Sequence, residues 1–181
     1  MNVWHDLNPE RITPSDFEAY IEIPKGCKSK YELDKETGLL KLDRILHTST
    51  RYPANYGFIP RTFAHDLDPL DVLVLCSETM YPGTLIQCDP IGYIRMVDSG
   101  YNDEKIIAIP FNDPTYNSYK DISELPQHIF KEMCHFFKVY KTLEDSDKYT
   151  EVEDVKGAKE AQTIIAQAIN DYKKTYGDLR K

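Results

Sequence analysis

Three aspartates crowd into six positions of the segment AHDLDPLDVLVL, residues 64–75, just before an apolar run. Asp66 and Asp68 are two residues apart, so on extended backbone their carboxylates face the same side, roughly 6.7 Å from each other. Pro69 fixes its own φ and has no backbone donor, so a regular strand can begin only after it. Asp71 then opens the apolar run. This spacing predicts a rigid set of carboxylates at the mouth of a buried strand.

Carboxylates this close need compensation by cations, by protons or by wide separation. A pair about 5 Å apart repels by about 3 kcal/mol at an effective dielectric of about 20. An EF-hand beginning at Asp66 would need Gly at position 71 and Glu at position 77, where the chain has Asp71 and Ser77. Oxygen ligands without a nearby cysteine favour magnesium or manganese over zinc. Taken alone, the stretch also fits a solvated acidic turn.

Other segments of the chain add carboxylates and phosphate-binding side chains to this cluster. A second acidic loop, VDSGYNDEK at 97–105, supplies Asp98 and Asp103, although alone it fits a charged hairpin tip. Arg and Lys bind phosphate oxygens, and Tyr donates a neutral hydrogen bond. Candidates of these types in turn-bounded settings are Lys30, Arg44, Tyr52, Tyr56, Tyr140 and Lys141. Together they predict a pocket with both signs of charge, suited to an anion that carries its own metal ions.

The bulk composition is that of one soluble globular domain spanning residues 1–181. The hydrophobic share is 41%, the charged share 29% and the net charge -8, with a pI near 5.1. This acidity argues against general binding to nucleic acid or to anionic membrane. The four widely spaced cysteines form no C-x-x-C pair, and neither a signal peptide nor a membrane-length apolar run is visible. We therefore expect reduced cysteines and a cytoplasmic protein.

The first two thirds of the chain read as short strands separated by turn signals. Alternation predicts strands at 17–23, 30–34, 39–46, 56–60, 72–76, 84–88, 91–98 and 105–111. KETG forms a turn, Pro82–Gly83 forms another, and the Asp89–Pro90 step suits a bulge or sharp bend. Many short strands of this kind favour a closed or nearly closed antiparallel barrel.

The last third changes to helical periodicity. One predicted helix lies within 122–141, with Asp121 or Ser123 as its cap and a stripe of Ile129, Met133, Phe136, Phe137 and Tyr140. A second runs from about Gly157 to Tyr176, with a stripe of Ala161, Ile164, Ile165, Ala168, Ile169 and Tyr172. Both stripes should face a core, and residues 177–181 should form a frayed tail. The predicted fold is mainly β with helices (α+β), a barrel with two C-terminal helices packed against it.

Two segments of the chain resemble those of a known family. YPANYGFIP at 52–60 followed by DLDPLDVLVL at 66–75 is similar to the soluble inorganic pyrophosphatases of type I, the magnesium-dependent family, in their short bacterial form. IEIPKGCKSKYELD, LDRIL, DSGYNDEK and HFFKVYK occur in the family's order. The resemblance covers about residues 15 to 145. It implies an OB-like five-stranded barrel and hydrolysis of inorganic diphosphate.

The resemblance also implies a role for each matching residue. Asp68 corresponds to the carboxylate that activates the attacking water. The main magnesium ligands would be Asp66, Asp71 and Asp103, with Asp98 and Glu22 at further cation sites and manganese as a substitute ion. The groups that hold the two phosphoryl units would be Lys30, Arg44, Tyr56, Tyr140 and Lys141. Glu32, Tyr52 and Lys105 would line the same cavity.

The chain departs from the family pattern at several positions. Ser99, Tyr101 and Asn102 stand where the acidic loop often carries more acids, which affects peripheral cation sites more than the central ones. Val139 stands where some members have a histidine that contributes to contacts between subunits. This substitution weakens the expectation of a homohexamer. Two alternatives stay open: a phosphatase for a larger phosphoanhydride such as a nucleotide or polyphosphate, and a non-catalytic OB-type binding module, which the acidic composition disfavours.

Overall fold

A closed ring of five strands forms the centre of the computed structural model, which describes residues 2–144 and 150–177. The ring contains, in order, β1 (Phe17–Ile23), β4 (Asn55–Phe58), β5 (Asp71–Val74), β8 (Lys105–Pro110) and β6 (Leu85–Asp98). Pairing of β1 with β6 closes it, which agrees with the predicted barrel. The prediction that all strands are antiparallel is wrong, because β5 and β8 pair in parallel.

The predicted break at Asp89–Pro90 is a bulge within one long strand. β6 continues through both residues, and its register against β8 shifts between Pro90 and Gly92. Two strands were not predicted: β7 (Tyr101–Asn102), and β9 (Thr150–Gly157), which pairs with β6 outside the ring.

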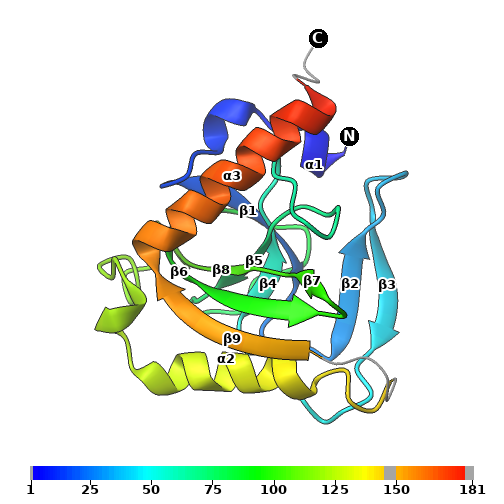
Figure 1. Ribbon diagram of the computed structural model, residues 1–181, viewed down its shortest axis with the longest axis vertical. Coiled ribbons are helices and arrows are strands. Elements are labelled where there is room, and N and C mark those ends of the chain that lie inside the picture. The colour runs from blue at the N-terminus through cyan, green and yellow to red at the C-terminus, as the bar shows by residue number, and fades with distance from the viewer. Residues whose placement is uncertain (1, 145–149, 178–181) are drawn as a thin grey trace.

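A separate two-stranded sheet stands beside the ring. It consists of β2 (Ser29–Leu33) and β3 (Leu40–Ile45), which Figure 1 shows as a hairpin projecting next to β1 and β7. The hairpin carries three of the predicted site residues, Lys30, Glu32 and Arg44. Its position therefore decides which of them face the acidic loops.

Helices cover the ring from two sides. Figure 1 shows α3 (Ala158–Tyr176) crossing one side and α2 (Gln127–Val139) running below β9. The first predicted helix is interrupted, because Asp121 caps the short helix η2 (Ile122–Glu124) and α2 begins only after Pro126. Two short helices, α1 (Val3–Asp6) and η1 (Pro9–Arg11), precede the ring. Within the described residues, no helix has the length and apolar character needed to cross a membrane.

Alternation along β5 separates the two larger of the three hydrophobic clusters found among the described residues. Val72 packs with Phe17, Ile21 and Ile165 on the side of α3, whereas Leu73 packs toward α2. The predicted helical stripes face these clusters, except that Tyr172 packs in a third cluster with Trp4 and Phe58. Ile129, Ile164 and Ile169 are only partly buried. Since side chains two apart on a strand share a face, Asp71 lies on the α2 side with Leu73. The predicted tail, apart from Gly177, lies outside the described residues.

Candidate active site

Twelve of the fourteen predicted site residues line one cavity of about 290 Å³. They come from the ring, the β2–β3 hairpin, both acidic loops and the segment after α2, and they are Glu22, Lys30, Glu32, Tyr56, Asp66, Asp68, Asp71, Asp98, Asp103, Lys105, Tyr140 and Lys141. The cavity is also lined by residues that were not predicted: Tyr31, Leu33, Lys35, Phe58 and Pro69. The fold thus gathers segments that are far apart in the sequence.

Lys105 and Asp71 form the buried centre of the site. The parallel register sets them side by side, with Lys105 Nζ 2.6 Å from Asp71 Oδ2. The same ammonium donates to Asp103 Oδ1 at 3.0 Å and to the Tyr56 hydroxyl at 3.1 Å. Its side chain is only 3% exposed. Burial opposes its charge, but the Asp103 and Asp71 carboxylates outweigh burial and raise the pKa of Lys105 well above its ordinary value.

The loop before β5 is a turn, and not the extended segment that the aspartate spacing suggested. Leu67 has a φ of 68°, and the Asp68 N–H donates to Asp66 Oδ1 at 3.2 Å, as in an Asx turn. Burial, and then the charges of Asp71 and Asp103, raise the pKa of Asp66 to about 6. The Asp68 carboxylate pairs with Lys35 from the turn of the β2–β3 hairpin.

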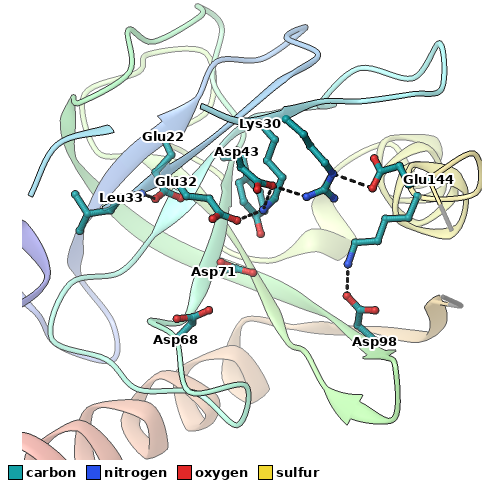
Figure 2. A network of polar contacts seen from close by, with 12 residues as sticks. Glu22, Lys30, Glu32, Leu33, Asp43, Asp68, Asp71, Asp98 and Glu144 are labelled. Carbon is teal, nitrogen blue, oxygen red and sulfur yellow. Dashed lines mark hydrogen bonds and ion pairs between the residues drawn. The ribbon is translucent and has the colours of Figure 1, made fainter. Parts of the chain in front are cut away.

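Glu22 on β1 is a buried carboxyl group that forms no ion pair within the described residues, although Lys30 is near enough to act on its charge. It is 8% exposed, and its Oε1 accepts from the Leu33 N–H at 2.7 Å (Figure 2). Burial, aided by Asp71 and Glu32, raises the pKa of Glu22 to about 8 despite that hydrogen bond. In the absence of cations it is therefore largely protonated at neutral pH.

Two predicted phosphate-binding lysines are held by carboxylates at the cavity wall. Lys141 pairs with Asp98, and Lys30 pairs with Glu32 and lies 3.3 Å from Asp43 (Figure 2). These contacts keep the ammonium groups at the cavity before any anion is present.

Arg44 and Tyr52 do not line the cavity. Arg44 pairs with Asp43, and its Nε lies 2.8 Å from Glu144 Oε2 at the end of the segment that follows α2.

Tyr52 is 2% exposed and packs behind the cavity wall, with its ring 5.1 Å from that of Tyr56 and 4.8 Å from that of Phe136. Tyr52 thus supports Tyr56 from behind.

Lys35 is the charged cavity residue that sequence reasoning missed. It lies at the KETG turn, where a lysine is ordinary, and its approach to Asp68 depends on how the hairpin folds over the loop. No local sequence pattern signals such a pairing.

The donor set of the cavity suits hard divalent cations. Seven carboxyl groups line it against four ammonium groups, so negative charge is in excess. Nowhere in residues 2–144 and 150–177 do three His, Cys, Asp or Glu side chains converge closely enough to hold one ion by themselves. The carboxylates nonetheless raise one another's pKa, and positive charge would relieve that repulsion. All donors are oxygen, which fits magnesium or manganese.

Comparisons with known proteins agree with one another. The family model described as inorganic pyrophosphatase matches residues 19–173. The chain is 46% identical over 173 residues to soluble inorganic pyrophosphatase 2 of Chlamydomonas reinhardtii, an alignment that spans 96% of this chain and 89% of that protein. It is 52% identical over 144 residues to the soluble inorganic pyrophosphatase PPA1 of Solanum tuberosum, covering 80% of this chain and 68% of that protein.

Solved structures give the same result. The inorganic pyrophosphatase of Thermus thermophilus superposes with a TM-score of 0.90 at 35% identity, covering 94% of this chain and 99% of the other. The enzyme from Helicobacter pylori gives a TM-score of 0.85 at 38% identity, covering 96% and 98% of the two chains. The ring of five strands and its helices are therefore shared with these structures.

Proposed function

The chain belongs to the inorganic pyrophosphatase family, and from this premise we propose that its acidic cavity hydrolyses inorganic diphosphate to two phosphate ions. The observation that carries the proposal is the cavity itself, in which seven carboxyl groups and four ammonium groups face the same space. A diphosphate accompanied by divalent cations matches such a mixture, because the carboxylates can bind the cations and the ammonium groups can bind the phosphate oxygens. The excess of carboxylates speaks against a bare anion as the ligand.

We assign the proton transfer to Asp68. Its side chain is half exposed and reaches the cavity, and its ion pair with Lys35 keeps the carboxylate in place. A water molecule within hydrogen-bond reach would give its proton to Asp68 as it attacks one phosphorus atom. The bond from that phosphorus to the bridging oxygen then breaks, and the second phosphate leaves.

Cationic and phenolic groups would hold the phosphoryl oxygens. The cavity wall already contains Lys30, Lys141, Tyr56 and Tyr140, so these residues can bind the substrate without rearrangement of the backbone.

Arg44 lies outside the cavity and is held by Asp43 and Glu144. We propose that Arg44 exchanges these carboxylates for a substrate oxygen when diphosphate binds.

Asp66, Asp71 and Asp103 would hold the principal divalent cations, with Asp98 and Glu22 contributing to further sites. When bound, magnesium, or manganese in its place, supplies a lowered pKa for a coordinated water and neutralises phosphate charge. Lys105 provides positive charge to Asp71 and Asp103 from the buried side of the same carboxylates. It thereby limits their repulsion both with and without cations.

Phosphate release from diphosphate, with and without magnesium, tests this function. We expect activity with magnesium, none after addition of EDTA, and poor replacement by calcium, whose larger and looser shell positions water less tightly. ATP and tripolyphosphate serve as competing substrates. Strong activity in metal-free buffer would contradict the metal assignment, and equal release from ATP would favour the phosphatase of larger phosphoanhydrides.

We propose further that the protein works as a cytoplasmic homo-oligomer, most simply a hexamer, with diphosphate as its ligand and no nucleic acid or membrane partner. Its four cysteines are all free thiols, which is compatible with a reducing compartment. The acidic net charge of -8 disfavours polyanionic partners.

A further inference from the structure

A second cavity, of about 380 Å³, lies at the C-terminal end of α3 and shares no residue with the acidic cavity. Apolar side chains form part of its wall, and two cationic residues, one phenol and a glycine complete it: Pro9, Ile12, Ile169, Arg61, Lys173, Tyr172 and Gly177. Its size is in the range of cavities that bind small organic molecules. None of its residues has a part in the proposed hydrolysis.

Arg61 is the unusual member of this wall, because it is buried with part of its guanidinium unsatisfied. The residue is 4% exposed, and its Nε donates to the Leu7 carbonyl at 2.9 Å. Its guanidinium lies over the ring of Tyr172, with Cζ 5.7 Å from the ring centroid. Its Nη2 is buried and has no hydrogen-bond partner among the described residues. An unmade hydrogen bond at a buried charged donor is expensive, so the site is short of an acceptor.

Arg61 has no carboxylate in direct contact among the described residues, although Asp6 acts electrostatically on the neighbouring Tyr172. No Asp or Glu is among the described residues of the cavity wall, and Arg61 forms no ion pair with any described carboxylate. The carbonyl end of α3 offsets part of the positive charge, but none of its described carbonyls accepts from Nη2. Lys173 adds a second positive charge at the exposed rim.

The backbone at Arg61 is also strained, with a φ of 61° in the left-handed region. Its N–H donates to the Trp4 carbonyl at 3.0 Å, and this contact holds the residue in that conformation. A strained backbone and an unpartnered buried donor at one residue together point to a ligand that would pair with the guanidinium.

We propose that this cavity binds a small organic carboxylate with an apolar body. The carboxylate would pair with the guanidinium of Arg61, whose buried Nη2 would turn toward the cavity to donate, and it would lie within reach of Lys173, while the apolar part would pack on Ile12 and Ile169. A singly charged planar group suits the one free guanidinium edge better than a phosphate dianion, which would need more donors. The proposal is independent of the hydrolysis of diphosphate.

Titration of the magnesium-loaded full chain with sodium benzoate tests the proposal, with calorimetry for affinity and NMR shifts to locate the site. We expect saturable binding with shifts centred on Tyr172 and Ile169. The neutral analogue benzamide should bind at least about tenfold more weakly, because it cannot pair with the guanidinium. No saturable benzoate binding would overturn the proposal. Equal affinity for benzamide would overturn it as well.

Variants assign the affinity to the cavity. Arg61→Gln should weaken benzoate binding about tenfold or more, and Arg61→Lys should recover part of it. Arg95→Gln, which removes an exposed arginine paired with Glu153, is the matched control and should bind as the wild type does. Ile169→Trp fills the cavity from the half-buried face of α3 without touching the charge, so it should also abolish binding. Unchanged affinity in a folded Arg61→Gln or Ile169→Trp protein would refute the site.

Discussion

Lys105 Nζ lies 2.6 Å from Asp71 Oδ2, and the parallel register of β5 and β8 is what places the two residues opposite each other. The ammonium also reaches Asp103, so one buried cation serves two of the proposed magnesium ligands. Both carboxylates therefore keep a counter-charge when no metal is bound. This arrangement explains how the chain can fold before it binds the cations that its acidic cavity requires.

We expect Lys105→Met to destabilise the metal-free protein by about 3–5 kcal/mol, because two partly buried carboxylates lose their only near cation among the described residues. Magnesium should recover part of the loss by replacing the missing charge. Urea unfolding in EDTA and in excess magnesium measures both effects. Lys156→Met breaks an exposed pair with Asp154 and should leave the free energy of unfolding nearly unchanged. A Lys105→Met protein as stable as the wild type in EDTA would contradict this account.

Glu22 should make the metal-free protein less stable as pH rises. Its pKa is about 8 in the folded state and near 4.5 in the unfolded chain, so the folded state binds the proton more tightly. The stability linked to this proton is complete below about pH 4.5 and is lost as pH rises to about 8. Glu22→Gln keeps an oxygen for the Leu33 N–H but cannot ionise. Relative to the wild type, it should gain up to about 5 kcal/mol across that window.

Urea unfolding in EDTA at pH 4.5, 6.5 and 8.5 gives the comparison between Glu22→Gln and the wild type. The difference between their free energies of unfolding should grow with pH. Excess magnesium should reduce it at high pH, because a bound cation compensates the wild-type carboxylate. Parallel pH profiles of the two proteins in EDTA would show that Glu22 does not titrate as proposed.

Assembly is a third prediction. Light scattering at micromolar concentration should give a mass about six times the 21.0 kDa of one chain. His135 is exposed on α2 and lines a surface hollow with Arg51, His128 and Glu132, a face suited to contacts between helices. His135→Asp adds a negative charge near Glu132 and should favour smaller species, whereas Thr163→Asp on the exposed face of α3 should not. A fully active wild-type monomer would rule the hexamer out.

Strands and helices with unbroken periodicity were predictable from the sequence. β1 occupies 17–23 as expected because its apolar residues alternate, and α3 follows its stripe from Ala161 to Tyr172. β9 was missed for a physical reason. Val152 and Val155 both pack inward but are three residues apart, because the register against β6 shifts between Arg95 and Met96. A bulge of this kind hides the period of two.

The sequence predicted most of the residues that line the acidic cavity, but it did not predict how they pair. The aspartate spacing and the family resemblance identified residues that share one cavity. Nothing in the sequence indicates that β5 and β8 are parallel, so Lys105 appeared only as a cavity residue and not as the partner of Asp71. Lys35 reaches Asp68 through the fold of a hairpin, which no local pattern specifies. Contacts between distant segments require the three-dimensional structure.

The roles of Asp68 and Asp71 should separate in a magnesium titration. Asp68 is half exposed and pairs with Lys35, whereas Asp71 is partly buried and is held by Lys105. Asn retains the size and one oxygen of Asp but cannot take up the proton. Asp68→Asn should therefore lower kcat by about 10²–10⁴-fold while magnesium and diphosphate still bind. Asp71→Asn removes a charge from a cation ligand, so it should raise the magnesium requirement.

Steady-state phosphate release at increasing magnesium concentrations makes the distinction. Excess magnesium should restore part of the rate of Asp71→Asn, because mass action refills a weakened site. It should not restore Asp68→Asn, because the missing function is proton acceptance and not cation binding. Glu36→Gln changes a carboxylate of the nearby hairpin turn that does not line the cavity, and it should behave as the wild type does. Rescue of Asp68→Asn by magnesium, with no rescue of Asp71→Asn, would show that the two roles are reversed.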